Sequence, residues 1–160
     1  MNQLRPTIQV ASDHAGFECK EGVKRWLRDH GYEVIDHGAK TYDPLDNYPD
    51  FISKAAAAVA AAPAVTKALI FGASGQGEAM LANRYPNVRA TVYYAPSTDI
   101  VKLSREHNDA NVLSIGARFV KVDEVIEILP LWLETEVSPL GKYHERIRQV
   151  EQLTKKIRNL

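Results

Sequence analysis

A glycine-rich segment that contains a serine and a glutamate carries the clearest chemical signal in this sequence. Residues 68–78 read ALIFGASGQGE, an apolar run followed by closely spaced glycines. Glycines let the backbone turn tightly and direct its N–H groups at an anion, and a helix that begins near Gly77 would add its positive end. Glu78 would lie in the first turn of that helix. A carboxylate beside an anion cradle can take a proton from a carbon next to a carbonyl.

The spacing of the glycines differs from that of two common nucleotide-binding motifs. The glycines follow G-x-x-G-x-G rather than the dinucleotide pattern G-x-G-x-x-G, and the lysine of a P-loop is absent. A simpler alternative is that Glu78 only complements the dipole of its helix. A second polar pair, Asp13 and His14, follows the first apolar run of the chain.

Alternating patterns along the chain predict the elements that position these residues. We expect helices that end near residue 30 and that span about 51–62, 97–107, 122–133 and 142–158, with strands at 7–11, 33–36, 68–71, 88–94 and 112–116. Strands separated by helices form a doubly wound parallel sheet. For five strands we expect the flavodoxin-like order 2-1-3-4-5, with its switch point between strands one and three. Both polar clusters would then meet in one crevice.

Composition limits the class of protein. The chain has 160 residues, which suits one domain, and 20 basic residues balance 20 acidic ones. This balance favours neither a nucleic-acid partner nor a membrane surface, and no apolar stretch is as long as a membrane span. The first ten residues lack the apolar core of a signal peptide. Cys19 is the single cysteine, so no internal disulfide forms, and we expect a cytoplasmic protein.

The last helix, about 140–160, carries an apolar stripe on an otherwise charged segment. Ile147, Val150, Leu153 and Ile157 recur at helical spacing. Because this helix follows the last strand of the sheet, we expect it to pack on a second subunit as a dimer arm. The alternative is a structural arm that packs on its own subunit.

Six short stretches follow one another along the chain: SDHAG at 12–16, NYP at 47–49, GASGQGE at 72–78, LAN at 81–83, REHND at 105–109 and NVLSIGAR at 111–118. In this order and spacing they resemble the family of type B ribose-5-phosphate isomerases and galactose-6-phosphate isomerase subunits, along nearly the whole chain. The family has one version with a cysteine base at the start of the glycine-rich loop and another with a glutamate at its end. Gly72 and Glu78 resemble the glutamate version.

The resemblance implies reversible conversion of an aldose phosphate to its ketose without a metal or an organic cofactor. Glu78 would move a proton between C1 and C2 through an enediolate. The Ser74 hydroxyl and the backbone N–H groups of the loop would stabilise the oxyanion; these N–H groups belong to Ala73, Gly75, Gln76 and Gly77. Removing one such donor typically costs about 3–4 kcal/mol.

The resemblance assigns His107 as the proton donor for ring opening and Asn108 as a neighbouring substrate contact. The helix 97–107 leaves the carboxyl end of its strand and runs back for about 16 Å at 1.5 Å per residue. His107 should therefore lie at the opposite edge of the sheet from Glu78 of its own chain. We expect a homodimer with active sites shared between subunits, and a tetramer as an alternative.

Phosphate binding is expected from Arg118 and from basic residues that open the last helix. The family has Arg-His-x-x-Arg there, so aligning Arg146 with its end puts Lys142 and Tyr143 at the first two positions. Lysine lacks the bidentate fork of arginine. An alternative register uses His144 and Arg148. At the switch point His14 would assist, Asp13 would orient it or contact sugar hydroxyls, and Tyr48 would line the pocket.

Several functions agree with these residues. The leading one is interconversion of ribose 5-phosphate and ribulose 5-phosphate. A six-carbon sugar such as allose 6-phosphate or galactose 6-phosphate is an alternative within the same class. A sugar-phosphate-binding module without turnover would need neither base nor acid. A metal-dependent isomerase would need a cluster of carboxylate and histidine ligands, and the sequence shows none.

Overall fold

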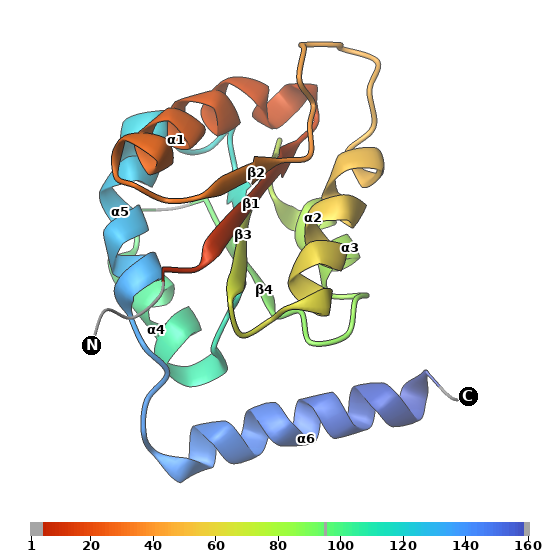
Figure 1. The fold of residues 1–160 in the computed structure, drawn as a ribbon, viewed down its shortest axis with the longest axis vertical. Coiled ribbons are helices and arrows are strands. Elements are labelled where there is room, and N and C mark those ends of the chain that lie inside the picture. Colours follow the sequence, from red (N-terminus) through yellow and green to blue (C-terminus); the bar gives the residue numbers. More distant parts are fainter. Residues whose placement is uncertain (1–4, 95, 159–160) are drawn as a thin grey trace.

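The computed structural model describes residues 5–94 and 96–158, which form one parallel sheet with helices on both faces (Figure 1). The strands are β1 (Thr7–Ser12), β2 (Val34–Asp36), β3 (Thr66–Gly72), β4 (Ala90–Tyr93) and β5 (Val112–Gly116). The helices are η1 (His14–Gly16), α1 (Phe17–Asp29), α2 (Pro49–Ala61), α3 (Gln76–Ala82), α4 (Thr98–Asn108), α5 (Val122–Glu134) and α6 (Gly141–Ile157). The doubly wound fold class is confirmed.

The order of the last two strands differs from the expectation. The sheet runs β2-β1-β3-β5-β4, so the expected order 2-1-3-4-5 was wrong at this edge. The chain passes over the place of β5 to form edge strand β4 and then returns. Because crossovers between parallel strands are right-handed, the return places α4 on the face that α1 and α5 cover, while α2 and α3 cover the other face (Figure 1). The switch point between β1 and β3 is unchanged.

The central strand β3 is buried on both sides, which explains its continuous apolar run. Leu69 and Phe71 pack into the cluster beneath α1, α4 and α5, and Ala68 and Ile70 pack into the cluster beneath α2 and α3. β5 is buried along its whole length, whereas β4 is mostly half-buried. The most apolar strands thus hold the centre of the sheet, and their carboxyl ends carry the glycine-rich loop and the Arg118 loop.

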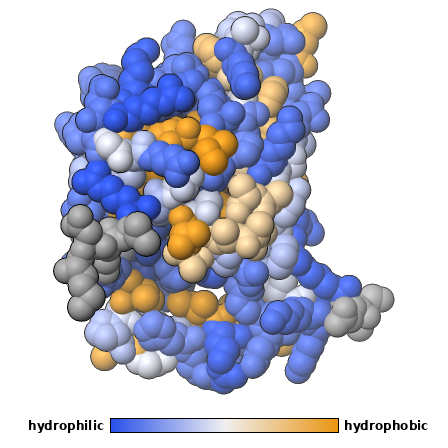
Figure 2. Space-filling view, in the orientation of Figure 1, coloured by the Kyte–Doolittle hydropathy of each residue, from blue (hydrophilic) through white to orange (hydrophobic). Residues whose placement is uncertain are grey.

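Helix α6 lies along the lower side of the molecule in Figure 1 and contacts it through α4 and Arg89. None of its residues is buried, and Val150, Leu153 and Ile157 of its apolar stripe are at least 56% exposed. A cleft of about 340 Å³ runs between α6 and the residues around the start of β4. Apolar surface is visible along the lower part of the molecule where α6 lies (Figure 2). No helix among the described residues is long and apolar enough to cross a membrane.

We expect Leu113→Ala to lower the free energy of unfolding by about 2–5 kcal/mol, because it leaves a cavity in a packed core. Leu113 is 1% exposed in the cluster beneath α5. Leu45→Ala is the matched control: this side chain is 86% exposed, and its loss should change stability by no more than about 0.5 kcal/mol. Urea denaturation measures both. Equal effects of the two substitutions would contradict the assignment of the core.

Candidate active site

The loop after β3 is held by its neighbour, the loop after β5. Ser114 Oγ donates to the Gly75 carbonyl (2.6 Å), Ala117 N to the Gly72 carbonyl (2.8 Å) and Arg118 N to the Ala73 carbonyl (3.1 Å). Gly75 has φ +76°, a conformation that favours glycine. Three carbonyls of the loop are thereby turned toward β5.

The N–H groups of the same loop are left available. None of the N–H groups of Ala73, Ser74 and Gly75 donates to another residue in the described part of the chain, and Gln76 N donates to Ser74 Oγ at 3.3 Å. Helix α3 begins at Gln76, so its first N–H groups also lack partners in preceding turns. These available N–H groups are the hydrogen-bond donors that a developing enediolate oxygen requires.

The Glu78 carboxyl group lies against Gly72, at the start of this loop. Glu78 is 5% exposed, and a Cβ on Gly72 would meet its Oε1 at 1.8 Å. Only glycine therefore leaves room for the carboxylate. A cysteine at position 72, as in the other version of the family, would need the same space. Burial raises the pKa of Glu78, its own backbone N–H opposes this, and the Asp13 charge adds to the rise.

Tyr48 joins this group from the start of α2. A Cβ on Gly77 would lie 3.0 Å from the Tyr48 hydroxyl, so the ring covers the first turn of α3. The structure thus brings together Tyr48, Glu78 and the glycine-rich loop, as the sequence predicts for the switch point.

A cavity of about 550 Å³ lies beside the switch point and is lined by both His14 and Arg118. Sequence reasoning missed other lining residues, among them Tyr42 and Lys121. The Tyr42 ring packs edge-on to His14, with ring centroids 6.2 Å apart. Cys19 also lines this cavity, but burial raises the pKa of its thiol to about 12. The thiol is therefore protonated at neutral pH and inert.

The orientation of His14 comes from an unexpected residue. Asp13 caps η1, with its Oδ1 accepting from Ala15 N (3.0 Å) and Gly16 N (3.4 Å), and its contact with sugar hydroxyls stays a prediction. Asp46 contacts the ring, with 2.7 Å between His14 Nδ1 and Asp46 Oδ1. The signal in the sequence was the acid just before the NYP stretch, in a loop that pattern alone does not place.

These residues also correct the expectation that no carboxylate and histidine cluster exists. Ligand atoms of Asp13, His14 and Asp46 lie within 4.8 Å of one another. The Nδ1 atom of His14 is already bonded to Asp46, and Asp13 caps the turn. The three side chains therefore form an internally bonded group, although their chemistry and spacing would suit a divalent cation.

The residues assigned to ring opening lie elsewhere. His107, Asn108 and Arg146 line a separate cavity of about 150 Å³ beside α6. The His107 ring stacks on Tyr143 with centroids 4.1 Å apart, and Lys142 Nζ lies 4.9 Å from the centre of the Tyr143 ring. In the register that ends at Arg146, Tyr143 occupies the position expected for histidine, so in that register the aromatic partner of His107 is a tyrosine.

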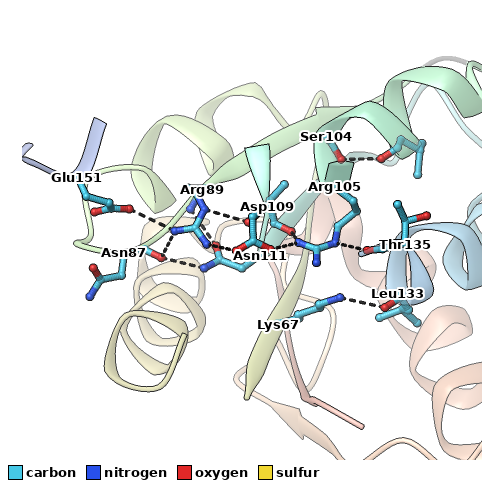
Figure 3. Close-up of polar contacts among 12 residues, drawn as sticks. Lys67, Asn87, Arg89, Ser104, Arg105, Asp109, Asn111, Leu133, Thr135 and Glu151 are labelled. Atoms are coloured by element: carbon cyan, nitrogen blue, oxygen red, sulfur yellow. Dashed lines mark hydrogen bonds and ion pairs between the residues drawn. The ribbon is translucent and has the colours of Figure 1, made fainter. Parts of the chain in front are cut away.

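A polar network fixes the end of α4 that carries His107 and Asn108 (Figure 3). Asp109 caps the helix, and its two carboxylate oxygens accept from Arg105 (2.8 Å) and Arg89 (2.9 Å). Arg89 also reaches Glu151 of α6 at 3.2 Å. Arg89 directly precedes β4, so the network lies at the amino edge of the sheet. In the REHND stretch, Arg105 and Asp109 hold the structure and leave His107 and Asn108 for other contacts.

The candidate residues therefore form two groups at opposite edges of the sheet. Glu78 and His14 follow the carboxyl ends of β3 and β1, whereas His107 and Arg146 lie near the amino ends of β4 and β5. Of the alternative phosphate residues, Arg148 is paired with Glu145 (2.7 Å) on the exposed surface. Only Arg146 of the two arginines lines the cavity of His107 among the described residues.

Comparison with known proteins decides the family. The ribose/galactose isomerase profile matches residues 8–150. The chain belongs to this family. It is 36% identical over 140 residues to ribose-5-phosphate isomerase B of Mycolicibacterium paratuberculosis, covering 88% of this chain and 86% of that protein. It is 34% identical over 143 residues to ribose-5-phosphate isomerase B of Escherichia coli, covering 89% and 93%.

Solved structures of the family have the same fold. The chain is similar to ribose-5-phosphate isomerase B of Clostridium thermocellum, with a TM-score of 0.87 and 34% identity over 94% of this chain and 99% of that one. The structure of the Mycoplasma genitalium isomerase B with bound ribulose 5-phosphate gives a TM-score of 0.89 at 29% identity, over 96% and 99%.

We expect Glu78→Gln to raise the temperature of unfolding at pH 8 by about 2–4 °C, which corresponds to about 1 kcal/mol for a chain of this size. The folded state raises the Glu78 pKa above its ordinary 4.5, so it binds the proton more tightly than the unfolded chain. Stability is therefore lost as the pH rises between the two values. At pH 3, well below the ordinary 4.5, both states are protonated and the gain should vanish. Glu127→Gln, at an exposed glutamate, is the control; a lower unfolding temperature for Glu78→Gln at pH 8 would contradict this.

Proposed function

We propose that this chain interconverts ribose 5-phosphate and ribulose 5-phosphate, the reaction that the names of its relatives state for them. The observation that carries the proposal is the buried Glu78 carboxylate, pressed against Gly72 beside a row of available N–H groups. Enediolate chemistry requires a general base and hydrogen-bond donors for the oxyanion, and this loop has both. A module that only binds sugar phosphate would need neither.

The proton that opens the ring and the proton that moves between C1 and C2 each have a proposed carrier. His107 of the partner subunit protonates the ring oxygen of the bound sugar as the O1 proton passes to solvent water, which opens the ring to the aldehyde. Glu78 then takes the proton from C2, and the electrons move to O1, which the loop N–H groups stabilise. Glu78 returns the proton to C1, and proton exchange between the two oxygens completes the ketose. A raised pKa makes Glu78 a better match for this transfer near neutral pH.

The two edges of the sheet support a homodimer with shared sites. One sugar phosphate cannot touch groups at opposite ends of the same sheet, so His107 and Asn108 act in the site of the neighbouring subunit. The exposed stripe of α6 is the surface expected of a dimer arm. We propose that residues 1–160 act as one isomerase domain, and that the cytoplasm, whose reducing conditions suit a single thiol, is its location. A tetramer of two dimers is the alternative, and its mass from sedimentation would distinguish it from a dimer.

The phosphate would be held by cations from both subunits. His14 and Arg118 line the cavity beside the switch point, while Lys142 and Arg146 lie on α6 near His107 of α4. The description of the matched family names both ribose and galactose isomerases, so allose 6-phosphate and galactose 6-phosphate belong in the same assay.

We expect Glu78→Gln to lower kcat for ribose 5-phosphate by about 10²–10⁴-fold, the usual contribution of a general base. The assay contains EDTA and compares ribose 5-phosphate with both hexose phosphates, for the wild type and the Glu127→Gln control. Faster turnover of a hexose phosphate would reassign the substrate. Activity that EDTA abolishes would point to the Asp13, His14 and Asp46 group as an ion site and overturn the cofactor-free mechanism.

Mixing two inactive variants tests whether the sites are shared. If His107→Gln and Glu78→Gln chains are unfolded, mixed and refolded, half of the dimers are mixed, and each contains one intact and one doubly substituted site. About a quarter of the wild-type activity should return, from random pairing in a two-fold dimer. Each variant refolded alone is the control. No recovery despite confirmed mixed dimers would show that each site is built within one subunit.

A further inference from the structure

The pairing of Asp46 with His14 is the feature of the structure that no motif of the family explains. Asp46 Oδ1 accepts both the His14 backbone N–H (2.9 Å) and the ring Nδ1–H (2.7 Å). One oxygen thus holds the backbone and the ring of the same residue. Because a carboxylate oxygen only accepts, Nδ1 carries a proton, and Nε2 is the atom left for a ligand. His14 lines the cavity that also contains Arg118.

The surroundings of Asp46 favour a positive charge on His14. The Asp46 side chain is 9% exposed, and its second oxygen, Oδ2, is buried without a hydrogen-bond partner in the described part of the chain. A carboxylate removed from water with one unpaired oxygen is costly unless a cation lies beside it. The neighbouring imidazole becomes that cation when Nε2 is also protonated.

The other charged groups near His14 only partly oppose this. The hydrogen bond that His14 donates to Asp46 raises the pKa of His14 most, the Asp13 charge adds to it, and desolvation and Arg118 lower it. The net direction is upward from the ordinary 6.5. The other titratable side chains that line the same cavity are Glu18, Cys19, Tyr42 and Lys121.

We propose that Asp46 is a positioning residue that holds His14 in the cavity as an imidazolium, which binds the phosphate group of the substrate together with Arg118. This inference rests on the proposed function and states how His14, one of its binding residues, acquires its charge and orientation. A charge-assisted hydrogen bond from Nε2–H to a phosphate oxygen is about twice as strong as a neutral one. The acid arrives from the loop before α2, so the same contact ties that loop to the switch point.

The competing explanation is that Asp46 only tethers its loop, which also carries Tyr42 and Tyr48. The two explanations differ in pH dependence. A tether acts equally at every pH, whereas a charged His14 binds anions below its pKa and loses this binding as the pH rises through it. Without Asp46 the loss should occur at a lower pH, near the ordinary value of histidine.

The decisive variant is Asp46→Asn, which keeps an oxygen acceptor for both N–H groups and removes the charge. Asp43→Asn is the matched control, because Asp43 belongs to the same loop, is exposed, and its side chain accepts only from Leu45 N among described residues. Inorganic sulfate is the probe for calorimetry, since it stays doubly charged, whereas a sugar phosphate itself titrates near pH 6. Binding is measured from pH 5.5 to 8.5, along with KM and kcat for ribose 5-phosphate.

At pH 5.5 the wild type and Asp46→Asn should bind sulfate within about twofold, because His14 is charged in both. At pH 7.5 sulfate binding by Asp46→Asn should be weaker and KM higher, each by about five- to tenfold, with kcat changed by less than about twofold. A loss that is the same at every pH, or an equal loss in Asp43→Asn, would overturn the proposal.

Two further measurements keep the result independent of turnover. The NMR titration of His14, assigned with His14→Gln, should show a midpoint that falls in Asp46→Asn and stays in Asp43→Asn. The double variant His14→Gln/Asp46→Asn should bind sulfate no more weakly than His14→Gln, because one residue acts through the other. Additive losses would overturn the proposal. If no sugar phosphate is turned over, the proposed function fails, while sulfate binding and the titration still decide the role of Asp46.

Discussion

The joining of the loops after β3 and β5 is the constraint on which the rest of the site depends. Three hydrogen bonds from the β5 side hold the carbonyls of Gly72, Ala73 and Gly75. With the carbonyls engaged, the N–H groups of the same peptide units are turned toward the switch point, and Glu78 lies in the space that Gly72 leaves. The same contact brings Arg118 to the cavity of His14. Both strands are buried, so this arrangement rests on the most rigid part of the sheet.

A second constraint is the length and direction of α4. This helix carries the chain from the carboxyl edge of β4 back to the amino edge of β5, and the buried Arg105 with Asp109 fixes its end. His107 is consequently held at the edge of the sheet opposite Glu78. The apolar stripe of α6 is exposed, and the ring of Tyr143 on the same helix stacks on His107.

The carboxyl groups of Glu78 and Asp46 differ in their electrostatic surroundings. Glu78 is buried without a cation beside it, so its pKa rises toward the range useful for a base. Asp46 is also buried, but it lies against an imidazole that can carry the opposite charge. Two buried carboxyl groups near one switch point thus have different electrostatic surroundings. Asp13, which precedes both in the sequence, holds the η1 turn.

The amino-acid sequence alone determined the fold class, the family and the location of the glycine-rich loop, because these depend on local patterns: apolar runs, glycines and the spacing of short motifs. It also placed His107 far from Glu78, since a helix has a fixed rise per residue. The order of β4 and β5 was decided by tertiary structure, because either order satisfies right-handed crossovers and only burial of both faces of β5 selects the centre of the sheet. The partner of His14 was likewise decided there. Asp46 lies 32 residues from His14 in a loop without periodicity, and such contacts arise from packing rather than from any pattern in the chain.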